Sequence, residues 1–347
     1  MMGSIRSSVG TSPERLPAEA AQLLNHRFII VAGKGGVGKS TMAMSLALAA
    51  AQSGRRTLLY QYGAQGVGRT PLADRDVGES IVALRPRLYA IRPTTESGMR
   101  EYAIMKLHSK TAYRIVFENG FIKKLLGAIP ALNELIWLGK AFFHERERDA
   151  AGQPVWDTIV LDPPATGHSL YMFKVPFVLR DAVPSGPLFE DAQNMVELLQ
   201  DPSRTALHLV TLPEEMPVNE CIQLKAELDA GMRIPMAALL VNGVFPNLFI
   251  DDRALLDSLI QRFHEPSDVI ARLLAAARFR MERRALQCHY IQRLRDAISL
   301  PLVELPYEFG GQITAASLEG FAERFLKLSK ASAPLACERG ARMRHDG

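Results

Sequence analysis

The chain has 347 residues, of which 48% are hydrophobic and 22% are charged, and its formal net charge is +4. This length allows one large domain, or two modest ones, with a buried core. Basic residues are spread along the whole chain and no apolar run approaches the roughly 18 residues of a membrane span, so we expect neither a nucleic-acid partner nor a transmembrane segment.

The regular elements alternate along the chain. Residues 1–26 form a polar stretch that we expect to be a flexible leader, and short apolar runs then alternate with helical patterns. Several runs are apolar throughout, which is typical of parallel strands buried on both faces. The pattern predicts an α/β fold with a doubly wound, mostly parallel sheet. The candidate strands lie at 27–32, 56–60, 87–92, 157–162, 206–211, 237–244 and 302–305.

Two apolar stretches depart from this order. The region from about 97 to 150 is rich in Leu, Ile, Phe and Met without a strand signal, and a second such stretch covers about 170–200. Apolar residues three and four apart after Pro130 favour helices. We therefore predict one domain over 27–328 with a helical insertion subdomain, followed by a flexible tail at 329–347. The apolar face of 121–143 either packs against 170–199, which we favour, or forms a groove for a hydrophobic client.

A glycine-rich segment follows the first predicted strand. The sequence GKGGVGKS at 33–40 matches G-x-x-x-x-G-K-[ST] and opens into a helix-forming run that begins at Thr41. Glycines let backbone N–H groups surround a β-phosphate, Lys39 neutralises the β and γ oxygens, and the Ser40 hydroxyl is placed to ligate Mg²⁺. The pattern predicts a P-loop NTPase that binds ATP with Mg²⁺. The predicted contacts in this segment are Gly33, Lys34, Gly35, Gly36, Val37, Gly38, Lys39, Ser40 and Thr41.

The segment contains a second lysine, Lys34, which sits too early to share the task of Lys39. GKGGVGKS resembles the deviant Walker A motif of the dimerising P-loop ATPases, which include the MinD/ParA group, the nitrogenase iron protein and the ArsA group. The resemblance implies that Lys34 crosses a dimer interface and stabilises charge in the partner's active site. Lys34 and Lys39 are thus candidate catalytic residues. The alternative for Lys34 is a solvated loop lysine.

The segment IVLDPPATGHSLYMFKVP at 159–176 resembles the D-x-x-P-T-G-H-T segment of the ArsA family, which includes arsenite-pump ATPases and the ATPases that target tail-anchored membrane proteins. Asp162 ends a predicted buried strand beside the phosphate loop, so it is a candidate to orient Mg²⁺ through water and to act in catalysis. The resemblance implies that Thr166, Gly167 and His168 form a switch that senses the γ-phosphate.

The resemblance to the ArsA family extends over roughly residues 27–328. The segment 209–246 shows the family's T-x-P-E segment, a helix, and a strand that ends in V-N. The resemblance implies that Asn242 hydrogen-bonds the adenine edge and that the loop at Pro306 lies near the base.

Three features depart from the family pattern. The family shows an aspartate that positions the attacking water after its second strand, and Tyr62 falls where that aspartate is expected. Tyrosine is a poor base at neutral pH, so hydrolysis is expected to be slow, dependent on a partner, or absent. The zinc clasp of the tail-anchored branch is missing, and no structural zinc is expected. Cys221, Cys288 and Cys337 are far apart, which fits a reducing cytoplasm and shows no arsenite site.

Three hypotheses follow for the function. The first is a dimeric ATPase switch, paired with itself or with a related ATPase, that drives a membrane-protein or other hydrophobic client or a transport partner. The second is a weakly hydrolysing or non-hydrolysing nucleotide-binding subunit of a heterodimer. The third, disfavoured because no basic amphipathic terminal helix is present, is a ParA/MinD-type positioning ATPase.

Overall fold

The computed structural model describes residues 23–62, 68–94, 98, 132–164, 166–246, 253–262 and 269–330. Most of the predicted leader, most of the first helical insertion and all but two residues of the predicted tail lie outside these ranges. The described start of the chain is packed, because Leu23 and Leu24 are buried in the core. The helices are α1 (Lys39–Gln52), α5 (Leu132–Arg146), α6 (Thr166–Ala182), α7 (Pro187–Gln200), α8 (Glu215–Gly231), α9 (Arg253–Arg262), α10 (Val269–Ala297) and α11 (Ala315–Lys330).

The centre of the protein is an eight-stranded sheet in the order β10-β9-β8-β1-β7-β2-β6-β5. All neighbours pair in parallel except β5 and β6, which confirms the predicted doubly wound, mostly parallel α/β fold. The seven predicted strands are present. The sheet consists of β10 (Leu302–Pro306), β9 (Met236–Val244), β8 (Thr205–Thr211), β1 (Phe28–Ala32), β7 (Thr158–Asp162), β2 (Thr57–Gln61), β6 (Leu88–Ile91) and β5 (Val82–Arg85).

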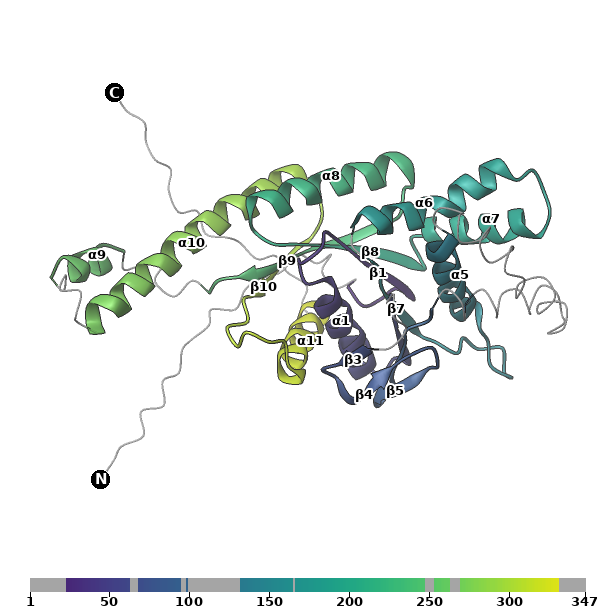
Figure 1. The fold of residues 1–347 in the computed structure, drawn as a ribbon, viewed down its shortest axis with the longest axis horizontal. Coiled ribbons are helices and arrows are strands. Elements are labelled where there is room, and N and C mark those ends of the chain that lie inside the picture. The colour runs from purple at the N-terminus through teal and green to yellow at the C-terminus, as the bar shows by residue number, and fades with distance from the viewer. Residues whose placement is uncertain are drawn as a thin grey trace, which may run out of the picture.

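Helices cover both faces of this sheet (Figure 1). Successive side chains of a strand point to opposite faces, so Ile29 and Val31 of β1 join a core with α1 and α11, whereas Phe28 and Ile30 join a core with α5, α6, α7, α8 and α10. Both faces of the strands are therefore apolar, which explains why the central strands read as continuous apolar runs.

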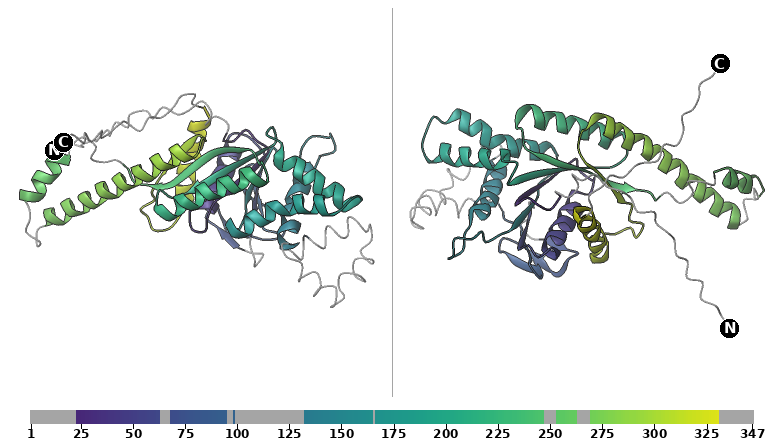
Figure 2. Two further views of the ribbon diagram at one scale, coloured as in Figure 1. Left: turned by 90° about the horizontal axis from the view of Figure 1, so that it is seen from above. Right: turned by 180° about the vertical axis from the view of Figure 1, so that it is seen from behind.

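The long helix α10 runs past the sheet and carries α9 at its outer end (Figures 1 and 2). Its inner half is anchored, because Ile291 and Leu294 are buried in the core. Its outer half is exposed, with Val269 59% and Leu273 65% accessible. The part of α10 that faces the sheet thus holds the last strands in place, while the outer part extends away from the body.

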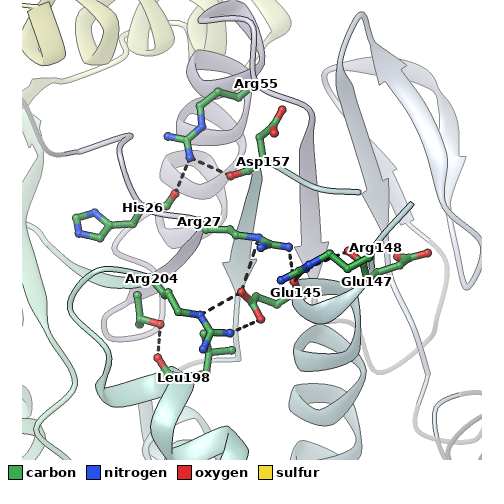
Figure 3. A network of polar contacts seen from close by, with 10 residues as sticks. His26, Arg27, Arg55, Glu145, Glu147, Arg148, Asp157, Leu198 and Arg204 are labelled. Carbon is green, nitrogen blue, oxygen red and sulfur yellow. Dashed lines mark hydrogen bonds and ion pairs between the residues drawn. The ribbon is translucent and has the colours of Figure 1, made fainter. Parts of the chain in front are cut away.

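A buried ion network ties α5 to the sheet (Figure 3). Glu145, at the end of α5, has no exposed side-chain surface, and Arg204 donates to its carboxylate at 2.5 Å. Arg27, just before β1, lies 3.7 Å from the same carboxylate and also donates to the Glu145 carbonyl. Since Arg27 and Arg204 directly precede β1 and β8, these ion pairs hold the end of α5 at the amino ends of the two strands. Removing one partner would leave a charge uncompensated.

The described part of the apolar 121–143 face is a packing surface, as the favoured alternative predicts. Within α5, Trp137, Leu138 and Phe142 are buried in the core, and Phe143 is half exposed. The packing alternative therefore holds for these residues, and the earlier part of 121–143 lies outside the described ranges.

Candidate functional site

The glycine-rich segment lies between β1 and α1 and approaches two neighbouring strands closely. A Cβ atom on Gly33 would lie 2.3 Å from the carbonyl oxygen of Val210 in β8, so only glycine fits there. Gly38 has φ +94, and a Cβ atom on it would lie 2.3 Å from the Asn242 amide nitrogen. The loop therefore passes close to β8 and β9 before it turns into α1.

The first turn of α1 is left open for an anion. Gly38 precedes the helix without a side-chain cap, and the first turn contains no acidic residue. The first N–H groups of a helix lack intrahelical partners and carry positive potential. A phosphate placed at this end would meet both the free donors and the helix dipole.

The Lys39 side chain lies inside the loop. It is 9% exposed, and its ammonium donates to the Lys34 carbonyl oxygen at 3.0 Å. Burial lowers the pKa of Lys39, and the charge of Asp162 opposes that effect. The Lys39 ammonium therefore donates to a carbonyl oxygen of its own loop and is also influenced by the charge of the buried Asp162 carboxylate.

Asp162 ends β7 next to the start of α1. It is 5% exposed, and burial raises its pKa from 3.8 to about 6. Hydrogen bonds from Ser40 and Gln61 and the charges of Lys39 and Arg92 hold that pKa down. The Ser40 hydroxyl and the Asp162 carboxylate are hard oxygen donors that touch each other, which fits the preference of Mg²⁺ for a few protein oxygens together with phosphates and water.

The side chains at the end of β2 alternate between the two faces. Leu59 faces the core beside α1, and Leu58 and Tyr60 face the opposite core. Gln61 therefore points to the α1 face, on the same side as Asp162, its register partner in β7, and it lowers the pKa of that carboxyl. Tyr62 packs against the opposite core, with its ring centroid 5.7 Å from that of Trp137. The structure thus brings Gln61 to the candidate site and places Tyr62, which falls where the family's water-positioning aspartate is expected, on the other side.

Gln61 also accepts a hydrogen bond from the Arg92 guanidinium at 3.4 Å. Arg92 directly follows β6, the neighbour of β2, and its charge acts on Asp162. Neither residue was identified from the sequence. The alternation of side chains between the two faces of each strand could have identified them, because the residue that ends each parallel strand on the α1 face lies beside the phosphate loop.

Lys34 points away from Lys39. Its ammonium lies 2.5 Å from a carboxylate oxygen of Glu220 in α8, and the Lys34 side chain is 52% exposed. The predicted interface lysine is thus accessible on the outside of the loop, but it is ion-paired within its own chain. Glu220 was not identified from the sequence, since α8 is far from the loop along the chain.

The two predicted adenine contacts lie at the ends of β9 and β10. The Asn242 amide donates to the Val37 carbonyl at 3.0 Å, and its oxygen accepts from the Gly243 N–H at 2.9 Å. Pro306 ends β10 beside Val244. Asn242 therefore contacts the phosphate loop in this structure, and Pro306 lies on the neighbouring strand end.

The predicted switch residues 166–168 begin α6. Their side chains lie outside the described part of the structure. Within the described ranges, no three His, Cys, Asp or Glu side chains come together to hold a metal ion. No helix among the described residues is both long and apolar enough to cross a membrane.

The chain is similar to known ATPases. A family model described as an anion-transporting ATPase, ArsA_ATPase, matches residues 26–184 and 187–260. The ATPase BagA of Mycobacterium tuberculosis is 32% identical over 231 residues, which cover 65% of this chain and 67% of that protein. The family match includes the phosphate loop, Asp162 and Asn242, and it ends before Pro306.

Two further relatives are named for arsenical pumps. A putative arsenical pump-driving ATPase of Halobacterium salinarum is 25% identical over 349 residues, which cover 90% of this chain and 48% of that protein. An arsenical pump-driving ATPase of Acidiphilium multivorum is 27% identical over 260 residues, which cover 69% of this chain and 43% of that protein. The match thus spans less than half the length of both pump-driving proteins.

Proposed function

The chain belongs to the ArsA family of anion-transporting ATPases, and we propose that it is a Mg²⁺-dependent ATPase that acts as a dimeric switch and couples its nucleotide state to a client or to a transport or targeting partner. The observation that carries the nucleotide part is the convergence of Lys39, Ser40 and Asp162 at the uncapped start of α1. Sparse cysteines support a cytoplasmic location.

The chain's own groups account for phosphate binding and charge stabilisation. N–H groups of the loop and of the first turn of α1 bind phosphate oxygens, and Lys39 exchanges the Lys34 carbonyl for the β and γ oxygens. Ser40 and Asp162 would hold Mg²⁺, which when bound neutralises charge on those oxygens. Asn242 and Pro306 are the proposed contacts for the base.

The dimer part of the proposal is supported by Lys34. A loop lysine with a half-exposed side chain can reach a second subunit, provided that its ion pair with Glu220 opens. An exposed pair of this kind is worth only about 0.2–1 kcal/mol, so a phosphate in a partner's site can compete for the ammonium. The partner is a second copy of this chain or a related ATPase.

The second candidate is a nucleotide-binding subunit that hydrolyses ATP weakly or not at all. It is favoured by one observation, that neither Gln61 nor Tyr62 at the end of β2 is a carboxylate. ATP binding would persist in this case, because the phosphate loop and Asp162 are unaffected.

Phosphate release from MgATP by the purified protein, with Lys39→Ala as the blank, tests the proposal. Turnover that is lost in Lys34→Ala supports an active dimer, and tight ATP binding without turnover supports the second candidate. The double charge reversal Lys34→Glu with Glu220→Lys tests the role of Lys34. It restores the pair within the chain, so recovered turnover would mean that Lys34 acts only in that pair and not across a dimer interface.

A further inference from the structure

We propose that Gln61 is a further catalytic residue, which orients the water that attacks the γ-phosphate, and that Arg92 is a positioning residue that acts through Gln61. This inference rests on the proposed ATP hydrolysis. It is carried by the placement of both side chains on the α1 face, beside Asp162.

The place of Gln61 follows from the sheet. Parallel pairing of β2 with β7 puts Gln61 opposite Asp162 at the carboxyl ends of both strands. Ligands of doubly wound sheets bind outside these ends. Gln61 is 4% exposed, comparable to Asp162 at 5% and Lys39 at 9%, so all three side chains are buried.

The hydrogen bonds of Gln61 leave the capacity that water orientation needs. Its carbonyl oxygen accepts from Arg92 and has a second lone pair, and its amide group has two N–H donors, one of which can serve Asp162, its register partner in β7. One acceptor site and one N–H of Gln61 thus remain. The acceptor site suits a water that donates a hydrogen bond to Gln61, and the N–H suits a γ-phosphate oxygen that accepts a hydrogen bond from Gln61. A glutamine in this role positions the nucleophile without acting as a strong base.

Arg92 determines which way the Gln61 amide faces. Since a guanidinium only donates, the atom that it contacts must be the carbonyl oxygen. The main chain of Gln61 is held as well, because the Trp137 indole donates to the Gln61 carbonyl at 3.3 Å. The side chain is therefore held in one orientation before a nucleotide arrives, and preorganisation of this kind lowers the barrier.

The chemical step is a displacement at phosphorus. The water oxygen forms a bond to the γ-phosphorus as the bond from that phosphorus to the β,γ-bridging oxygen breaks, and ADP leaves with that electron pair. The proton lost by water passes to the released phosphate and to solvent. Gln61 gains and loses no proton in this step, so no additional reactant is required.

The test compares Gln61→Leu with Gln200→Leu, a matched control. Gln200 bonds the Met232 carbonyl at 2.8 Å, away from the phosphate loop. For each protein, kcat and KM for MgATP are measured, together with dissociation constants for MgADP with and without aluminium fluoride, a mimic of the transferred phosphoryl group. Gln61→Leu is expected to lower kcat by about 10²–10³-fold. It should weaken binding of the aluminium fluoride complex while MgADP binding stays unchanged.

Arg92 is tested by replacement and conservative rescue. Arg92→Ala is expected to lower kcat by about tenfold or more with KM unchanged, because the Gln61 amide loses its fixed orientation. Arg92→Lys, which retains a donor, should recover part of the loss. An equal loss in the alanine and lysine variants would show that Arg92 does not act by holding the Gln61 oxygen.

The outcomes separate the inference from the proposed function. If Gln61→Leu keeps wild-type kcat and wild-type affinity for the aluminium fluoride complex, the inference is overturned and the proposed function stands. Equal weakening of MgADP with and without aluminium fluoride would assign Gln61 a structural role and also overturn it. A wild-type protein that binds nucleotide without turnover still tests Gln61 through the aluminium fluoride complex. Failure of the wild-type protein to bind any nucleotide overturns both.

Discussion

Two buried titratable side chains give opposite pH dependence to the stability of the nucleotide-free protein. Burial raises the pKa of Asp162 from 3.8 to about 6. Burial lowers the pKa of His208 from 6.5 to about 4, although the bond between its ring and the Leu23 carbonyl opposes that change. Each departure is roughly two pH units, which corresponds to about 3 kcal/mol.

The signs follow from proton binding. The stability that protonated Asp162 contributes is present below about pH 4 and is lost as the pH rises through about 6. The stability that neutral His208 contributes is present above about pH 6.5 and is lost as the pH falls through about 4. Between about pH 4 and pH 6, stability falls with rising pH through Asp162 and rises through His208 by a similar amount, so the two changes nearly cancel in the wild-type protein.

Asp162→Asn separates them. Asparagine is close to aspartate in size, keeps one acceptor oxygen and removes the cost of a buried charge. At pH 7.5 we expect the free energy of unfolding to rise by about 3 kcal/mol, which is about 4 °C in Tm for a chain of this size. At pH 4 the gain should vanish, because Asp162 is then protonated in the native wild-type protein. As the pH falls from 6.5 to 4, the variant should lose stability through His208.

Differential scanning calorimetry from pH 4 to 7.5, without nucleotide or Mg²⁺, measures these differences. Asp229→Asn, at a half-exposed carboxylate on α8, is the control and should shift Tm little at any pH. A gain for Asp162→Asn that is the same at pH 4 and at pH 7.5, or no gain at all, would refute the reasoning about its buried charge.

Three further outcomes are expected. Glu145→Ala should lower the free energy of unfolding in urea by about 3 kcal/mol, because it leaves the partly buried charges of Arg27 and Arg204 without their carboxylate, and no loss would show that the network is not stabilising. Burial raises the pKa of Cys221 to about 12, so iodoacetamide followed by mass spectrometry should label the partly exposed Cys288 before Cys221, which reacts only on unfolding. Gly33→Ala should abolish ATP binding in calorimetric titration, whereas Gly320→Ala, in open space on α11, should raise stability by about 1 kcal/mol.

The parallel core of the fold could be predicted because its strands are apolar on both faces. The strands β3 (Gly68–Thr70), β4 (Ala73–Val77) and β5 were not predicted, since all three are short. In addition, β4 and β5 carry charged residues, and β4 belongs to a two-stranded sheet while β5 lies at the edge of the main sheet. Such strands form where a neighbouring backbone offers hydrogen bonds, which local composition does not reveal.

The phosphate loop could be predicted because its glycines and lysines are local in sequence. The partner of Lys34 could not, because Glu220 reaches the loop only through the packing of α8. The choice between Gln61 and Tyr62 depends on a single residue of strand register, which decides the face of the sheet on which each side chain lies.

The polar groups of the phosphate loop contact one another and their neighbours. Lys39 donates to the Lys34 carbonyl, Lys34 pairs with Glu220, and Asn242 donates to the Val37 carbonyl. On the proposed function, ATP binding therefore exchanges these contacts for contacts to phosphate and base. The net gain is smaller than the new contacts alone would suggest, because each group gives up a partner. Since Lys34 and Lys39 share the loop backbone, the exchange at one lysine acts directly on the position of the other.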